Sequence, residues 1–181
     1  LGDVYKRQAL LVLEALDRDE IALTDSVQIS PRAAAMKGSQ ALLDASAVYP
    51  LEDLLRTTIM ASANDSAVAL SEYIAGSEEN FVDRMNRRAA ELGMTNTNYV
   101  NCTGYPQSGQ YTTARDVCRL CCEIAKHPRY NQYASVWIDK LTHPGGRVTD
   151  LTNTNRLVRF YEGCDGYKTG STDAAKYCLA A

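Results

Sequence analysis

Cys164-Asp165-Gly166-Tyr167-Lys168-Thr169-Gly170-Ser171-Thr172 is the stretch from which the fold of this chain is best predicted. It stands just before residues 174–179, an alternating run typical of a β-strand. Within it, Lys168, Thr169 and Gly170 offer an ammonium, a hydroxyl and an open backbone at consecutive positions. Such an edge suits a carboxylate ligand and a peptide lying alongside the strand. By itself the tripeptide is a weak signal, because a lysine before a Thr-Gly turn is also typical of a solvated strand end.

A second polar motif, Ser62-Ala63-Asn64, lies between two segments with helical periodicity. Residues two positions apart do not face the same side of a helix. Ser62 and Asn64 can therefore point into one cleft only if the backbone breaks between the two helices. Asn64 or Asp65 would then supply the N-cap of the second helix. A plain cap between two helices is the alternative interpretation of this motif.

Together these motifs resemble two of the three elements of serine penicillin-interacting enzymes, Ser-x-Asn and Lys-Thr-Gly, in the order of that family. More of the chain is similar to the low-molecular-weight D-alanyl-D-alanine carboxypeptidases, the penicillin-binding proteins that trim peptidoglycan stem peptides. The similarity covers about residues 9–181. The runs that carry it are Gly38-Ser39-Gln40, residues 62–70, Ile74-Ala75-Gly76-Ser77, Glu91-Leu92-Gly93-Met94, Asn153-Thr154-Asn155 and residues 165–170.

This resemblance implies an α/β (α+β) fold of the β-lactamase/transpeptidase-like kind. An antiparallel sheet carries helices on its faces and stands beside a helical lobe, with the active site between them. Relative to that fold we expect the chain to be truncated at both ends. The strand that carries Lys168 would then lose neighbours and expose an edge.

The resemblance also implies a reaction: removal of the terminal D-alanine from peptidoglycan pentapeptides by acyl transfer to serine, followed by hydrolysis. Ser62 would relay protons and Asn64 would hold the substrate amide, while Lys168, Thr169 and Gly170 would bind the terminal carboxylate and backbone. Neither a metal nor an organic cofactor is implied. β-Lactams present a carboxylate and a strained amide at equivalent places, so they would act as inhibitors. Enzymes of this kind are exported and act in the cell envelope.

The first eight residues lack both helical periodicity and the family resemblance. In the family, the apolar segment that begins here at Ala9 continues the helix whose first turn carries Ser-x-x-Lys. Counting back places Gly2 at the nucleophile and Tyr5 at its lysine, and neither side chain can do that chemistry. We interpret residues 1–8 as a non-native leader and residues 9–181 as a partial transpeptidase-like domain. An inactivated paralogue is the alternative.

Composition excludes several partners. A chain of 181 residues allows one domain, and its net charge of −3 gives no basic surface for nucleic acid. No basic amphipathic stripe or apolar run of about 20 residues indicates a membrane contact, and no signal peptide is present. We expect any membrane contact only through segments outside this sequence.

The cysteines and histidines give weaker signals. Cys118, Cys121 and Cys122 have no second Cys or His pair at zinc-ligand spacing. Helical periodicity predicts Cys121 as a small core residue, flanked by the other two as free thiols. His127 and His143 both precede prolines outside the motifs, so we expect surface or turn positions and no Ser-His-Asp triad.

Two other functions remain open. A β-lactamase of the same fold shares the motifs and differs in its fast deacylation. No Glu-x-x-x-Asn signature stands near residues 96–106, and the Gly-Ser-Gln and Asn-Thr-Asn runs favour the carboxypeptidase. A catalytically inactive peptidoglycan-binding homologue is favoured if the loss of Ser-x-x-Lys is genuine. The rim loop Cys102-Thr103-Gly104, which reads Pro-His-Gly in the family, is a further departure.

Overall fold

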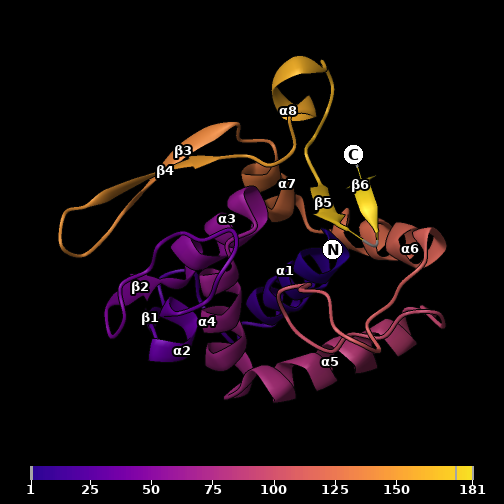
Figure 1. Ribbon diagram of the computed structural model, residues 1–181, viewed down its shortest axis with the longest axis horizontal. Coiled ribbons are helices and arrows are strands. Elements are labelled where there is room, and N and C mark those ends of the chain that lie inside the picture. Colours follow the sequence, from indigo (N-terminus) through magenta and orange to yellow (C-terminus); the bar gives the residue numbers. More distant parts are fainter. Residues whose placement is uncertain (1, 174, 181) are drawn as a thin grey trace.

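A helix at the N-terminus forms the centre of the molecule in the computed structural model, which describes residues 2–173 and 175–180 (Figure 1). This helix, α1 (Gly2–Asp17), packs against helices on several sides and against the last hairpin. Ala9, Leu10 and Val12 are fully buried. The predicted buried helix over residues 9–16 is therefore confirmed, because its apolar residues cover nearly the whole circumference.

Residues 2–8 extend α1 although their sequence has no helical periodicity. Arg7 and Gln8 are fully buried, and Arg7 Nε and Nη1 and Gln8 Oε1 have no hydrogen-bond partner among the described residues. An unsatisfied buried polar group costs about 1–3 kcal/mol. Side chains that match a core position so poorly agree with a leader that is foreign to this fold. That residues 1–8 are such a leader stays a prediction.

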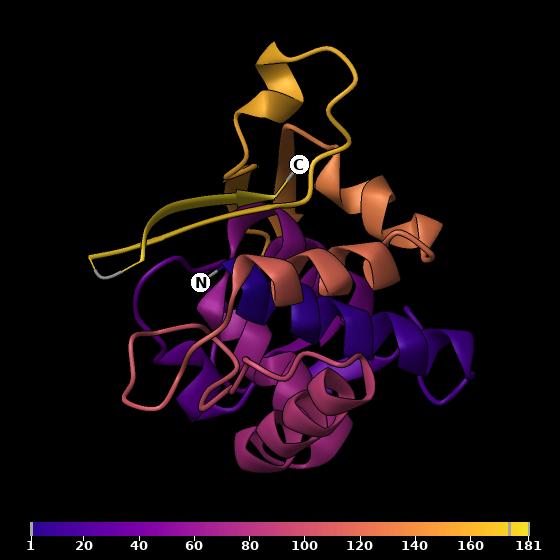
Figure 2. The ribbon, with the colours of Figure 1, turned by 90° about the vertical axis from the view of Figure 1, so that its right-hand side faces the viewer.

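The remaining helices surround α1 and form the larger part of the molecule (Figures 1 and 2). Hydroxyl groups cap two of the long ones: Ser77 accepts from Asn80 N, and Thr113 accepts from Asp116 N. The helices are α2 (Pro31–Ala34), α3 (Leu51–Ala61), α4 (Asn64–Ala75), α5 (Glu78–Glu91), α6 (Ala114–Ile124), α7 (Pro128–Ala134) and α8 (Leu157–Phe160).

The strands pair into small antiparallel ribbons of two, consistent with the expected mixed fold. The first ribbon joins β1 (Ser26–Gln28) to β2 (Val48–Pro50), and the second joins β3 (Ile138–Thr142) to β4 (Val148–Thr152). The third joins β5 (Lys168–Thr172) to β6 (Lys176–Ala180), with Thr169 opposite Leu179 and Gly170 opposite Cys178. Within the described ranges no other strand pairs with β5 or β6, so the third ribbon has the open edges that we expected.

The cysteine-containing helix α6 buries Leu120 and Ile124, whereas Cys121 is half-buried and Cys118 and Cys122 are exposed. Cys118 and Cys122 are thus the flanking free thiols that we predicted, whereas the prediction of Cys121 as a core residue is wrong, because Leu120 and Ile124 form the buried face of α6. Across residues 2–173 and 175–180, no group of three or more His, Cys, Asp or Glu side chains is placed to hold a metal ion. In the same ranges, no helix combines the length and apolar character needed to cross a membrane.

His143 corrects one expectation. It lies at the β3–β4 turn as predicted, but its side chain is buried rather than at the surface. Its Nδ1 lies 2.6 Å from Tyr49 Oη and its Nε2 lies 2.8 Å from Thr149 Oγ1. His127 is half-buried at the start of α7, with Nδ1 2.7 Å from Asp17 Oδ2. The turn therefore uses His143 as a structural anchor for the β3–β4 ribbon.

The junction of α3 and α4 positions the polar motif. Ser62 ends α3 in the left-handed conformation (φ 56°, ψ 39°), and α4 begins two residues later. The predicted break is thus confirmed, but the predicted cap is wrong: Ala63 is the N-cap, and no side chain caps α4. The Asp65 carboxylate instead accepts hydrogen bonds from Ala41 N at 2.9 Å, Leu43 N at 3.1 Å and Ser66 N at 2.9 Å.

Removal of the Asp65 carboxylate should therefore destabilise the fold. Asp65 is fully buried, and Asp65→Ala would remove the acceptor of three backbone donors, Ala41 N, Leu43 N and Ser66 N. We expect a loss of roughly 3 kcal/mol in the free energy of unfolding, measured by urea denaturation. Asp65→Asn keeps one acceptor oxygen and should lose less. Equal stability of the alanine variant and the parent chain would show that these contacts do not hold the junction.

Candidate active site

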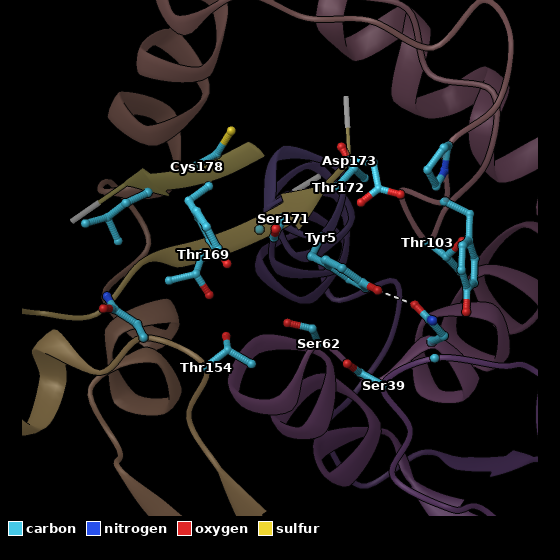
Figure 3. Close-up of a pocket in the computed structure, with 18 of the residues that line it drawn as sticks. Tyr5, Ser39, Ser62, Thr103, Thr154, Thr169, Ser171, Thr172, Asp173 and Cys178 are labelled. Carbon is cyan, nitrogen blue, oxygen red and sulfur yellow. Dashed lines mark hydrogen bonds between the residues drawn. The ribbon is translucent and has the colours of Figure 1, made fainter. Parts of the chain in front are cut away.

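A cavity of about 1180 Å³ lies between the α3–α4 junction and the β5–β6 hairpin. Its walls come from segments that are far apart in the sequence: Tyr5 of α1, Ser62 and Asn64 at the junction, the loops at residues 103–106 and 154–157, and residues 169–173. Figure 3 shows Ser62 and Thr169 on opposite sides of this space, with Thr154 between them. The fold therefore brings the two predicted motifs to one site.

The left-handed backbone at Ser62 places its side chain at the cavity, where Oγ has no hydrogen-bond partner among the described residues. Asn64 is held more firmly. Its Nδ2 donates to Lys37 O at 2.6 Å, and its backbone N donates to Ser39 O at 2.8 Å. Ser62 is thus free to exchange a hydrogen bond with a ligand, whereas Asn64 is fixed as part of the wall.

Tyr5 occupies the position that the resemblance assigns to the lysine of Ser-x-x-Lys. Its hydroxyl donates to Asn64 Oδ1 and its ring lines the cavity (Figure 3). Burial raises the pKa of this hydroxyl, with smaller contributions from Cys102 and Tyr105. The phenol is therefore neutral at physiological pH and cannot accept a proton from a neighbouring serine.

Lys168 is almost completely buried behind the cavity wall, at 2% exposure, and does not line the cavity. Its Nζ donates to Thr154 Oγ1 at 3.1 Å and to Thr169 O at 2.9 Å, and lies 5.4 Å from the centre of the Tyr5 ring. Burial, with a smaller contribution from the nearby charge of Lys6, lowers the pKa of Lys168 to about 7. The solvated strand end is therefore excluded as an interpretation of this lysine.

Thr169 and Gly170 do line the cavity, as does Ser171. Of the three predicted carboxylate-binding residues, two thus line the cavity, and Lys168 lies buried immediately behind them. The edge of β5 opposite β6 is unpaired within the part of the chain that the structure describes. An extended peptide can use such an edge for backbone hydrogen bonds.

The loop at residues 153–155 contributes to the site in a way that the sequence did not reveal. Asn153 Nδ2 donates to the carbonyl oxygens of Ala134 and Val136, at 2.8 Å each, and Asn155 Nδ2 donates to Gly166 O. Between them, Thr154 N donates to Met60 O at 3.1 Å. The side-chain amides of Asn153 and Asn155 therefore connect this loop to the end of α7 and to the segment that precedes β5. In the sequence, the Asn-Thr-Asn run indicated only a similarity to the family and did not predict these contacts.

The rim opposite β5 is formed by Gly38, Thr103 and Tyr105. Gly38 has a φ of +87°, and a Cβ there would collide with the hydroxyl of Tyr105 and the amide of Asn64. Thr103, which replaces the histidine of the family loop, is buried at this rim. At this position of the rim the chain thus offers a hydroxyl group to the cavity.

Comparison with known proteins gives one consistent result. The sequence model of a family described as D-alanyl-D-alanine carboxypeptidase (Peptidase_S11) matches residues 8–181. The chain is 42% identical over 172 residues to the D-alanyl-D-alanine carboxypeptidase DacF of Bacillus subtilis. This match covers 95% of the present chain and 44% of DacF. The chain therefore spans less than half the length of that relative.

Solved structures agree with the sequence comparison. The D-alanyl-D-alanine carboxypeptidase DacD of Francisella tularensis superposes with a TM-score of 0.93 at 26% identity, covering 98% of this chain and 55% of DacD. Penicillin binding protein 5 of Haemophilus influenzae superposes with a TM-score of 0.88 at 30% identity, covering 97% of this chain and 51% of that protein. The expected fold class is thereby confirmed.

The buried ammonium of Lys168 predicts a specific pH dependence of stability. From about pH 7 to about pH 10, the unfolded chain keeps the Lys168 proton while the folded chain releases it, so stability rises with pH. We expect the unfolding free energy of the chain, relative to Lys168→Met, to rise by roughly 3 kcal/mol between pH 7 and about pH 9.5. Lys140→Met, at an exposed lysine, is the control. Parallel pH profiles of the chain and Lys168→Met would contradict the lowered pKa.

Proposed function

This chain belongs to the D-alanyl-D-alanine carboxypeptidase family, and from that premise we propose that its protein removes the terminal D-alanine from peptidoglycan stem peptides. The reaction is acyl transfer to a serine followed by hydrolysis, and it takes place in the cell envelope. The observation that carries this proposal is the placement of Ser62 and Asn64 opposite Thr169 and Gly170 across one cavity.

The cavity offers complementary groups for a peptide ending in D-Ala-D-Ala. We propose that the substrate lies along the open edge of β5, with its terminal carboxylate beside Thr169 and its backbone against Gly170. Asn64 would hold the amide of the penultimate residue, and Ser62 would relay a proton during bond cleavage. These roles are supported by the free Ser62 hydroxyl and the polar wall around it.

Lys168 would contribute charge rather than contact. With a pKa of about 7, its amine is partly protonated at neutral pH, and an approaching carboxylate favours the protonated form. The cation so formed is held by Thr154 Oγ1 and Thr169 O. We infer that carboxylate binding and protonation of Lys168 are coupled, which adds affinity for a C-terminal acid over a C-terminal amide.

β-Lactams are the expected inhibitors, since they present a carboxylate and a reactive amide at the same spacing. The name of the Haemophilus influenzae neighbour, penicillin binding protein 5, supports this extension. Recognition of such ligands needs the walls described above, whereas covalent capture also needs a nucleophile. The first serine of this sequence is Ser26, so α1 contains none.

A binding-only protein is the second candidate, and Tyr5 favours it. The neutral phenol occupies the place of the general base and keeps Asn64 bonded within the protein. A chain with this arrangement would recognise D-Ala-D-Ala peptides without cleaving them. The two candidates differ in catalysis and share the recognition surface.

We expect that a fluorescent penicillin will not label the chain with the sequence given. Gly2→Ser together with Tyr5→Lys should restore labelling at least in part, because the pair supplies the nucleophile and its base at the positions that the resemblance indicates. Gly2→Ser alone, which keeps Tyr5, is the matched control and should stay unlabelled. The readout is gel fluorescence with adduct mapping by mass spectrometry. A serine adduct on the unaltered chain would overturn this assignment.

Lys168→Gln tests the carboxylate site directly. Because Lys168 acts through its charge from behind Thr169 and not through a hydrogen bond to the ligand, its loss should weaken peptides ending in free D-Ala-D-Ala by about 10-fold, while the same peptides amidated at the C-terminus lose much less. Lys168→Arg should recover part of the loss, because it keeps the charge. Binding is measured by calorimetry on chains shown to be folded by circular dichroism. Equal losses for both peptides would mean that Lys168 supports the strand and not the carboxylate.

A further inference from the structure

A buried imidazole joins two parts of the chain that are far apart in the sequence. His143 belongs to the tip of the β3–β4 ribbon, residues 143–147, and is only 2% exposed. Its Nδ1 lies 2.6 Å from the hydroxyl of Tyr49, and the two rings meet edge to face with 5.7 Å between their centroids. Figure 1 shows the ribbon reaching past α3 toward β2, the strand that carries Tyr49. The tip is therefore docked on the segment at residues 42–49.

Arg147 completes this contact and determines which ring nitrogen carries the proton. Its Nη2 donates to Leu42 O at 2.6 Å and to Asp44 Oδ1 at 2.8 Å, and lies 3.1 Å from the imidazole Nδ1. A guanidinium can only donate hydrogen bonds, so Nδ1 of His143 must present a lone pair to it. The other nitrogen, Nε2, then carries the proton and donates to Thr149 Oγ1 at 2.8 Å. The docked tip therefore requires a neutral imidazole.

The groups around His143 act on its pKa in opposite directions. Burial and the Arg147 cation lower the pKa of the imidazole, whereas the carboxylates of Asp44 and Asp65 raise it, and the net effect is a pKa below the usual value. Asp44 lies 3.7 Å from Nδ1, but it is exposed and already paired with Arg147. Burial raises the pKa of the Tyr49 hydroxyl, so this neighbour stays neutral in acid. The docked imidazole therefore binds a proton less readily than an exposed histidine.

The base of the ribbon is held by contacts that contain no histidine. Arg56 of α3 forms an ion pair with Asp139 and donates to Lys140 O at 3.2 Å. On the other strand, Asn153 N donates to Trp137 O at 2.9 Å. Protonation of the imidazole therefore acts on the tip and leaves the base attached.

We propose that His143 is an acid-sensitive latch: protonation at Nδ1 releases the tip of the β3–β4 ribbon from residues 42–49. The new N–H would face the donors of Arg147, and two positive charges would lie side by side in a buried place. The guanidinium then moves away from the ring, and its hydrogen bonds to the segment break. That segment follows directly on residues 38–39, which line the main cavity, so acid loosens the cavity rim. The latch does not depend on the proposed reaction.

Docking of the tip should be complete above about pH 6.5 and should weaken as the pH falls. In the released tip the imidazole regains its usual pKa near 6.5, so the released state binds a proton more readily than the docked state. The equilibrium between the two states can then shift by at most about tenfold for each pH unit below 6.5. At about pH 5 the released population should therefore rise by no more than roughly 30-fold.

Hydrogen exchange followed by mass spectrometry tests the latch, with each rate divided by the intrinsic rate at the same pH. Between about pH 7.5 and about pH 5, we expect exchange of the tip and of residues 42–49 to rise by about threefold to 30-fold. The peptide from α5, on the far side of the molecule, should not change (Figure 1). His143→Gln should give equal corrected rates at both pH values whether its tip is docked or released, because glutamine does not titrate.

The chain contains two histidines, so His127→Gln is the matched control and leaves His143 as the single imidazole. This variant should keep the full response, and its one imidazole signal in NMR should titrate below about pH 6.5. Arg147→Gln in the same background removes the neighbouring cation and should raise the midpoint. A response that survives His143→Gln, or that is lost in His127→Gln, would overturn the latch. An equal rise in the exchange of α5 would also overturn it, because acid would then unfold the whole chain.

Discussion

The left-handed turn at Ser62 is the constraint on which the rest of the structure depends. It ends α3 and lets α4 restart two residues later, so that two polar side chains reach one cavity. Asp65 stabilises the turn from behind, because its carboxylate binds the backbone of the segment that forms the opposite rim. A regular helix through residues 61–65 would send Ser62 and Asn64 to different faces and would release that rim.

Local chemistry allowed much of the site to be predicted from the sequence. The Lys-Thr-Gly run lies on a strand edge as its composition indicated, and the break near Ser62 followed from the spacing of two polar residues on helical segments. The prediction that Asn64 or Asp65 caps α4 failed because the helix already begins at Asn64, and because the Asp65 carboxylate binds Ala41 N and Leu43 N, more than twenty residues away. Partners at that distance leave no local pattern.

Burial was the other property that the sequence could not supply. Lys168 was expected to meet a carboxylate directly, yet Tyr5, Thr154 and the strand itself enclose its amine. Likewise, His143 looked like a turn residue and became a buried anchor, since Tyr49 and Thr149 approach it from separate segments. In each case the environment of a titratable group is built by tertiary contacts, which decide whether it carries charge.

The β5–β6 ribbon also offers a surface through which molecules of this chain can meet in concentrated solution. Tyr177 is 93% exposed and Leu179 is 55% exposed on β6, whose outer edge pairs with no strand in the described residues. An unpaired edge with exposed apolar side chains is a template for another extended chain. This ribbon is therefore a place where two molecules can pair edge to edge. Conditions that prevent β6 of one molecule from pairing with β6 of another favour the monomer at high protein concentration.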